Sequence, residues 1–383
     1  MRFVIVFLIF FCTETFGQSL SSLNLHHWYD PNTEIEFVMT PLNKGKSFRL
    51  YYQLISNRKE NSIDNYSINW ELRNTLEERD GQNIIAVDST LFKNINTLKG
   101  MLILPPPAKH SYIMAQVVNN STQQSYIFYR PLDPQWPVSG IVNAEGFPLL
   151  KSFVPIASSI SFQEPEKKLN GFFYKLTFGA AKPPYAETVA GDPFLKSDST
   201  FTSSGTIVPK TIGLYLFQED STTNSGISFI AANKVYPKYN TIADLAGPLV
   251  YICTDEEYQD LQAAAASKPT FDNFILNLTG DKDRAKNLMR SYFQRVEAAN
   301  RYFTDYKEGW KTDRGMIYII FGLPDDVTRT ANQEIWNYKI ARTKFTFNLA
   351  GSIFNPETYK LHRGSQYMMQ WFSQIDLWRK SRF

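Results

Sequence analysis

Cysteine is the scarcest residue of this chain, with only two copies among 383 residues. Cys12 lies in an N-terminal segment that we expect to be removed, so the mature chain cannot form an internal disulfide. A chain of this length can build a hydrophobic core without one. Cys253 lies in the apolar run LVYIC, which predicts a buried small hydrophobic residue rather than a reactive thiol.

The motifs of metal, nucleotide and nucleophile chemistry are missing as well. The four histidines, at positions 26, 27, 110 and 362, are scattered, with no H-E-x-x-H and no paired cysteines. The sequence contains neither a G-x-G-x-x-G loop nor a P-loop, and it has no G-x-S-x-G elbow. We therefore predict no metal and no cofactor, and expect a non-enzymatic protein.

Neither sign of charge dominates, and no long apolar run occurs after the N-terminus. Lysine and arginine number 40 against 37 acidic residues, which gives a net charge of +3. The charges are interspersed and form no basic stripe, so nucleic acid is not an expected partner. No later run reaches the roughly 18 consecutive apolar residues of a spanning helix. The mature chain is therefore predicted to lack a transmembrane helix.

The N-terminus has the anatomy of a cleaved secretory signal peptide over residues 1–17. Nine apolar residues beginning at Phe3 follow a short positive start, and the small residues Thr15 and Gly17 precede the cut. A lipoprotein signal ending at Cys12 is the alternative. Bulky residues rather than small ones precede that cysteine, so lipid anchoring is not expected. We predict an exported protein, periplasmic or associated with the outer membrane.

Short strand-like runs fill most of the N-terminal two thirds of the chain. Residues 18–131 contain seven runs rich in β-branched and aromatic residues, separated by Asn, Gly, Lys and Pro clusters. This spacing predicts an antiparallel, β-sandwich-like domain. The pattern resumes over residues 138–250, where we predict a second, smaller β-rich domain with a polar loop at 182–206.

Residues 255–383 differ in composition and predict helices followed by a small antiparallel sheet. Asp255 is a suitable N-cap for a helix that Pro269 stops, and a short helix covers Phe271 to Leu278. The clearest helix runs from Asp281 to about Phe303, because apolar residues recur there at spacings of three and four. The predicted fold class is mainly β with a C-terminal α+β domain.

The stretch KEGWKTDRGMIYIIFGLPDDV joins this helix to the predicted sheet. Gly309 suits the left-handed conformation that ends a helix, Gly315 suits a second permissive position, and Trp310 is a candidate core anchor. Met316–Phe321 is rich in β-branched and aromatic residues, which predicts a buried strand. Alternating strands are predicted next, over 334–340 and 344–349. The region is therefore predicted to be a long helix followed by an antiparallel meander.

These residues resemble the GWxTD domain, which occurs in exported proteins of Bacteroidota and related bacteria. The motif itself is Gly309-Trp310-Lys311-Thr312-Asp313, and the resemblance covers about residues 270 to 350. The matching positions are Gly309, Trp310, Thr312, Asp313, Arg314, Gly315, Gly322, Pro324, Asp325, Trp336 and Tyr338. The resemblance implies a secreted, multi-domain protein with β-rich material before the motif. It implies structural or partner-binding roles for these residues and no particular chemistry.

Three acids of the motif region, Asp313, Asp325 and Asp326, could converge, and two of them could then act as a catalytic pair. A glycosidase needs two carboxyl groups about 5 to 10 Å apart. If the residues between Asp313 and Asp325 form a strand, its rise of roughly 3.3 Å per residue places the two acids about 30 Å apart. We therefore expect turn capping by Asp313 and a turn built by Pro324-Asp325, with a partner-binding surface as the alternative.

Three Asp-Ser-Thr tripeptides resemble the sites at which Bacteroidota O-glycosylate exported proteins. They place candidate acceptors at Ser89, Ser199 and Ser221. Ordinary polar turns are the alternative interpretation.

Three hypotheses about function remain open. The first is an exported binding or scaffolding protein of the cell envelope that works in a multiprotein assembly. The second is a carbohydrate-binding or carbohydrate-active protein that contacts a glycan through exposed aromatic residues such as Trp136, Tyr185 or Trp371. The third is an outer-membrane protein assembly factor. It rests on a faint similarity to envelope lipoproteins with a strand, a G-x-P turn and a W-x-Y strand.

Overall fold

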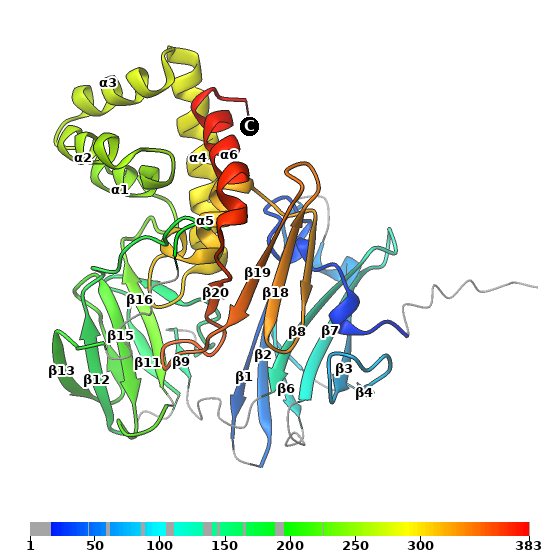
Figure 1. Cartoon of the computed structure of the whole chain (residues 1–383). Coiled ribbons are helices and arrows are strands. Elements are labelled where there is room, and N and C mark those ends of the chain that lie inside the picture. Colours follow the sequence, from blue (N-terminus) through cyan, green and yellow to red (C-terminus); the bar gives the residue numbers. More distant parts are fainter. Residues whose placement is uncertain are drawn as a thin grey trace, which may run out of the picture.

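A computed structural model describes residues 17–44, 46–58, 62–85, 89–104, 111–132, 140–143, 146–163, 166–187, 195–224 and 226–382 (Figure 1). Most of the predicted signal peptide, including Cys12, lies outside the described residues, as do His110 and Trp136. Two β-rich regions and a C-terminal sheet occupy one side of the molecule, and the helices gather at the other end. None of the described helices is both long and apolar enough to cross a membrane.

The first β-rich region is a sandwich of two antiparallel four-stranded sheets. One sheet has the order β1-β2-β6-β5 and comprises Ile35–Asn43, Phe48–Ser56, Thr97–Leu104 and Thr90–Lys93. The other has the order β4-β3-β7-β8 and comprises Gln82–Ile84, Tyr66–Arg73, Ser111–Asn119 and Ser125–Leu132. Alternate residues of both sheets, such as Phe37 and Trp70, form one buried core. The predicted sandwich is confirmed.

The second β-rich region also contains two sheets. The larger has the order β10-β16-β15-β12-β13 and comprises Phe153–Pro155, Ile227–Ala232, Gly213–Gln218, Leu169–Tyr174 and Ser199–Ser203. The smaller has the order β14-β11-β9 and comprises Thr206–Ile207, Ile160–Phe162 and Ile141–Val142. Strand β13 lies within the stretch predicted as a polar loop, and all but its last residue are exposed. The domain boundaries themselves stay a prediction.

The helices follow at residue 242. They are α1 Ile242–Ala246, α2 Asp255–Ala264, α3 Lys268–Thr279, α4 Lys282–Phe303, α5 Asp313–Phe321 and α6 Met368–Arg379, with short 3₁₀ turns such as η5 Gly309–Lys311. The predicted helix from Asp281 to about Phe303 is α4, and Asp281 is its N-cap. The predicted cap of α2 is wrong by one residue, because Thr254 and Glu257 form a capping box there. Pro269 does not stop a helix either, since it lies in the first turn of α3, where its missing N–H costs nothing.

The C-terminal sheet is the predicted meander. Its strands, in order, are β17 Asp326–Arg329, β18 Gln333–Tyr338, β19 Thr343–Leu349 and β20 Tyr359–Leu361, and all pairs are antiparallel. Alternation places Glu334, Trp336 and Tyr338 on the buried face of β18. The predicted fold class, mainly β with a C-terminal α+β part, is therefore confirmed.

The predicted strand at Met316–Phe321 is wrong, because these residues form most of helix α5. Thr312 caps the helix by accepting the N–H of Gly315 at 3.0 Å. The five residues from Met316 to Ile320 are all buried, so the run shows no alternation that would distinguish a buried strand from a buried helix. Tertiary packing thus overrides the β propensity of Ile and Tyr.

The segment that follows the predicted signal peptide belongs to the C-terminal core. Leu20, Leu25 and Tyr29 are buried in the same apolar cluster as Trp310 and Trp336. The N–H of Leu25 donates to the carbonyl of Val327 at 2.7 Å, and the N–H of Val327 donates to Asn24 at 2.9 Å. The two ends of the sequence therefore share one core.

Candidate functional site

Two motif glycines, Gly309 within GWxTD and Gly315 two residues after it, are required by close packing rather than by an unusual backbone conformation. Neither Gly309 nor Gly315 has a positive φ, so the predicted left-handed role is wrong. A Cβ on Gly309 would lie 2.1 Å from the carbonyl oxygen of Ala299 in α4. A Cβ on Gly315 would lie 1.9 Å from the carbonyl oxygen of Gly309. The glycines therefore let the motif backbone pack directly against α4 and against itself.

Trp310 lies in the core at this junction, as expected from the sequence. Its backbone N–H donates to the side-chain oxygen of Asn300 at 2.9 Å, and its indole N–H donates to the hydroxyl of Tyr239 at 2.8 Å. The buried Asn300 amide also donates to the carbonyl of Pro237 at 3.1 Å. The motif thus links α4 to the segment that precedes α1.

Asp313 does not cap its own turn. Its carboxylate accepts the backbone N–H of Leu361 at 2.8 Å and forms an ion pair with Arg363. Arg363 also donates to the carbonyl of Lys182 at 3.0 Å. Asp313 therefore joins α5 to β20 and to the second β-rich region, whereas Thr312 provides the local cap.

The acids of the motif region bond to different parts of the chain. The residues from Asp313 to Phe321 form a helix and not a strand, and a nine-residue helix rises only about 14 Å. The predicted separation of about 30 Å between Asp313 and Asp325 is therefore wrong. Their bonding partners nevertheless differ. Asp325 accepts the N–H of Lys339 at 2.7 Å, and Asp326 pairs with the Lys339 ammonium at 3.2 Å. These contacts give Asp325 and Asp326 a structural role in the turn between α5 and β17.

The remaining motif residues complete that turn. Gly322 has a φ of +85°, which favours glycine, and its carbonyl accepts the Tyr338 hydroxyl at 2.8 Å. Pro324 and Trp336 are buried.

Arg314, the residue after the motif, belongs to a buried cluster of charged side chains. Its guanidinium lies 3.5 Å from the carboxylate of Glu334, which is fully buried on β18. Glu334 also pairs with Arg329, accepts the Tyr29 hydroxyl at 2.9 Å and accepts the Trp336 indole N–H at 2.7 Å. One carboxylate therefore connects α5, β17, β18 and the N-terminal segment.

A second carboxylate, Glu357, extends the cluster to the sandwich. Glu357 pairs with Arg130 of β8, and its other oxygen lies 3.9 Å from Arg329. Arg314 stacks over the rings of Tyr359 and Phe303, at 4.5 and 5.2 Å from their centroids.

Both carboxylates have lowered pKa values. Burial opposes their ionisation, but the guanidinium groups of Arg329 and Arg314 outweigh it at Glu334 and hold its pKa below the ordinary 4.5. Arg130 and Arg329 do the same at Glu357. The pKa of Asp305 is shifted in the opposite direction, because burial raises it above its ordinary value.

Acid is expected to weaken the fold through this cluster. Where the folded pKa is below the unfolded pKa, the stabilisation is complete above the unfolded value and is lost as pH falls through the folded value. We expect the urea midpoint to be constant from pH 7 to about pH 5 and to fall below about pH 4.5. Urea titrations followed by circular dichroism at each pH would measure it, and a midpoint that rises below pH 4.5 would contradict it.

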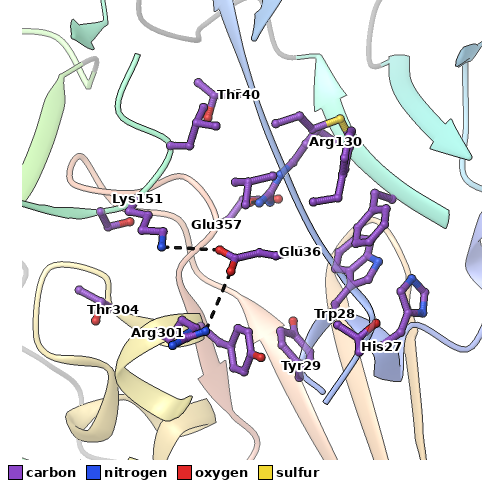
Figure 2. A pocket seen from close by; sticks show the side chains of 18 of the residues that line it. His27, Trp28, Tyr29, Glu36, Thr40, Arg130, Lys151, Arg301, Thr304 and Glu357 are labelled. Atoms are coloured by element: carbon purple, nitrogen blue, oxygen red, sulfur yellow. Dashed lines mark hydrogen bonds and ion pairs between the residues drawn. The ribbon is translucent and has the colours of Figure 1, made fainter. Parts of the chain in front are cut away.

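Beside this cluster a cavity of about 340 Å³ opens where the sandwich, the second β-rich region and the C-terminal part meet. Figure 2 shows the Glu36 carboxylate between Lys151 and Arg301, one residue from each of the three parts. The Glu36 oxygens lie 3.6 Å from the Lys151 ammonium and 4.0 Å from the Arg301 guanidinium. Arg130, Arg314, Arg329 and Glu357 also line the cavity, so the ionic cluster forms part of its wall.

The aromatic residues in the cavity wall are packed against other groups. The rings of Trp28 and Phe128 are stacked, with their centroids 6.2 Å apart. The Arg329 guanidinium lies 4.7 Å from the centroid of the Trp28 ring. Tyr129 packs edge-on against Trp28. The Tyr129 hydroxyl is buried and has no hydrogen-bond partner among the described residues.

The other sequence-predicted positions lie away from this cavity. Trp371 is buried, so the expectation of an exposed aromatic there is wrong, and Tyr185 is half-buried against Phe372. The hydroxyl of Ser89 bonds to Tyr52 at 2.9 Å, whereas Ser199 and Ser221 are exposed. No group of three metal-ligating side chains occurs within the described part of the chain.

Cys253 is partly buried, and burial raises the pKa of its thiol to about 12. The thiol therefore stays protonated at neutral pH, as expected for a packing residue.

The cavity and most of the ionic cluster leave no recognisable signal in the sequence. Tyr29, Arg130 and Glu357 are single polar residues in unrelated segments, and nothing in their spacing connects them. Glu334 did carry a signal. It shares the alternation of Trp336 and Tyr338 in EIWNY, so it falls on the face predicted to be buried, where a charge requires partners.

The fold and the packed motif define a β-rich, multi-part protein whose C-terminal part is an α+β unit closed by the N-terminal segment. Residues 213–380 match the family model of the GWxTD domain, so the chain carries that domain. The match begins at β15 and thus includes two strands of the second β-rich region, well before the segment from 270 that carries the resemblance in sequence. A comparison with curated proteins finds no match.

Proposed function

We propose that this chain is an exported, non-enzymatic binding or scaffolding protein of the bacterial cell envelope that works within a multiprotein assembly. Its proposed export rests on the signal-peptide pattern of residues 1–17. The observation that carries the binding role is an exposed apolar edge on the sandwich. Several large exposed apolar side chains fall within residues 85–95, while the GWxTD residues are used for internal packing, so this edge is the better place for a partner.

The apolar edge comprises Ile85, Leu91, Phe92 and Ile95. Ile85 is 86% exposed and Ile95 is 70% exposed, whereas most such residues in the sandwich are buried. Ile85 directly follows β4, Leu91 and Phe92 lie on β5, and Ile95 lies in the turn after it. Large exposed apolar residues concentrated in one short stretch of surface chain are typical of protein interaction sites.

Strand β5 adds a backbone surface to this edge. It pairs with β6 on one side and stands at the end of its sheet in the order β1-β2-β6-β5. All four of its residues, Thr90–Lys93, are exposed. An edge strand offers N–H and C=O groups to an added strand, and neighbouring apolar side chains then give the contact specificity. The proposed partner is therefore a protein that adds a strand to β5.

Replacing Leu91 and Ile95 together by glutamate is expected to remove the partner. Charged side chains at both positions oppose apolar burial while leaving the sandwich core untouched. Affinity purification of the full chain from detergent-solubilised envelope should recover a defined partner set with the wild type and lose it with this double variant. Ile340→Glu is the matched control, because Ile340 is equally apolar and 95% exposed but lies on the β18–β19 turn.

Two results would count against this proposal. A wild-type chain that purifies as a clean monomer from solubilised envelope would contradict the scaffolding role. Partners that persist in the Leu91 and Ile95 double variant would contradict the role of the β5 edge.

The other two hypotheses gain less from the structure. Of the aromatic residues that suggested carbohydrate binding, Trp371 is buried and Tyr185 is half-buried. The similarity to assembly lipoproteins assumed a strand before the G-x-P turn, and that element is helix α5.

A further inference from the structure

We propose that the cavity between the three parts of the chain binds the anionic group, carboxylate or phosphate, of a small molecule, and that Lys151 and Arg301 hold this group in exchange for Glu36. This inference concerns a different surface from the β5 edge and does not depend on a protein partner there.

The mouth of the cavity carries two cations that share one carboxylate. Lys151 and Arg301 lie 3.6 and 4.0 Å from the oxygens of Glu36, and their side chains are 49% and 40% exposed. Ion pairs this long and this exposed stabilise a protein little. Arg301 is further shared with Glu297, at 3.5 Å. An entering anion can therefore displace Glu36 at small cost and gain both positive charges.

The cations of the wall differ in how open they are to an anion. Five cationic side chains line the cavity, at positions 130, 151, 301, 314 and 329, with three carboxylates at 30, 36 and 357. Glu334 pairs with the buried Arg314 and Arg329, and Glu297 is shared with Arg301, so the charges are balanced overall. His27 adds no charge at neutral pH, because burial lowers its pKa to about 4. Lys151 and Arg301 are the most exposed of the five cations, so they are the ones that an entering anion reaches.

The wall also contains an unused hydrogen-bonding group. The hydroxyl of Tyr129 is buried and finds no partner among the described residues, which is costly for a group of this kind. Its oxygen has almost no accessible surface, so a ligand would have to displace its neighbours to reach it. The direct contacts that the site offers are therefore the two cations at the mouth.

A neutral sugar fits this cavity less well. Sugar sites present an open aromatic face on which the ring stacks. The Trp28 ring stacks against Phe128 and also contacts the Arg329 guanidinium. The Tyr29 ring packs against Phe303 and Trp336. The aromatic residues therefore form a packed wall, and the charged groups decide what enters.

The test uses matched aromatic probes and isothermal titration calorimetry on the full mature chain. Benzoate and phenyl phosphate carry the two anionic groups, and benzamide is the neutral counterpart of benzoate. We expect saturable binding of one or both anions and none of benzamide. A preference for phenyl phosphate would indicate a phosphorylated ligand, and a preference for benzoate would indicate a carboxylate. Binding should weaken as salt rises from low to about 0.5 M.

Two variants give opposite results if the exchange is correct. Arg301→Gln removes one cation and should weaken anion binding about tenfold, the size of one charge-assisted hydrogen bond. Glu36→Gln removes the competing carboxylate while keeping the shape of the side chain, and should tighten binding roughly fivefold. Glu219→Gln is the matched control, because it breaks an exposed pair with Lys167 in the second β-rich region and should change nothing.

The tightening by Glu36→Gln is a result that a purely structural role would not produce. Equal binding of benzamide and benzoate, no binding of either anion to the wild type, or unchanged or weaker binding in Glu36→Gln would each overturn the proposal. The β5 variants should bind the probes like the wild type, so this result and the partner result can be told apart.

Discussion

Replacing Gly315 by alanine is expected to lower the free energy of unfolding by about 3 kcal/mol or more, or to prevent folding altogether. The added Cβ would lie 1.9 Å from the carbonyl oxygen of Gly309, which is backbone and cannot rotate away as a flexible side chain can. Relief would require moving η5 away from α5. That movement would disturb the bond between Thr312 and Gly315 that begins the helix. The urea midpoint of the purified variant measures the loss.

A second glycine provides the control for this prediction. A Cβ on Gly179 meets nothing within 4 Å, and the residue has no positive φ, so Gly179→Ala should be neutral or stabilise slightly. Gly309→Ala should behave like Gly315→Ala, because its Cβ would lie 2.1 Å from the backbone of Ala299. A Gly315→Ala chain with the wild-type midpoint would show that the motif glycines are not required for packing.

The local elements of this fold were predictable where the residues face two different environments. Helix α4 has an apolar stripe against the core and charged residues elsewhere, so its period of 3.6 is visible in the sequence. The strands of the sandwich alternate in the same informative way. Helix α5 is surrounded by protein, and its sequence therefore has no period that a reader could detect. The prediction for this segment therefore rested on β propensity alone, which is a weaker signal.

The site was less predictable because its contacts are almost all long-range. Tyr29 and Glu334 are 305 residues apart, and Arg130 and Glu357 are 227 residues apart, yet each pair is in direct contact. Local spacing carries no information about such pairs. The burial of Glu334 was the one part that alternation could reveal. The role of the motif glycines was also hidden, since a turn glycine and a close-packing glycine look the same in a single sequence.

Replacing Glu334 by glutamine is expected to lower the free energy of unfolding by about 3 to 5 kcal/mol, because it removes the carboxylate that two buried guanidinium groups share. Glu334 is fully buried, pairs with Arg329 and Arg314, and accepts the Tyr29 hydroxyl. The glutamine keeps the volume, so the loss measures charge rather than packing. Asp376→Asn, which breaks the exposed pair with Lys380, is the control and should cost less than about 1 kcal/mol.

The same substitution should also loosen the N-terminal segment, because Tyr29 reaches the C-terminal sheet through this carboxylate. Limited proteolysis of Glu334→Gln is expected to cut within residues 18–34 sooner than in the wild type, while the sandwich stays resistant. Replacing Arg314, Arg329 and Glu334 together by methionine removes both guanidinium groups with the carboxylate they share, while Glu357 keeps its pair with Arg130. This triple variant should restore much of the stability lost in Glu334→Gln. If it were less stable than Glu334→Gln, the ion pairs themselves, and not the unpaired guanidinium groups, would be the source of the stability.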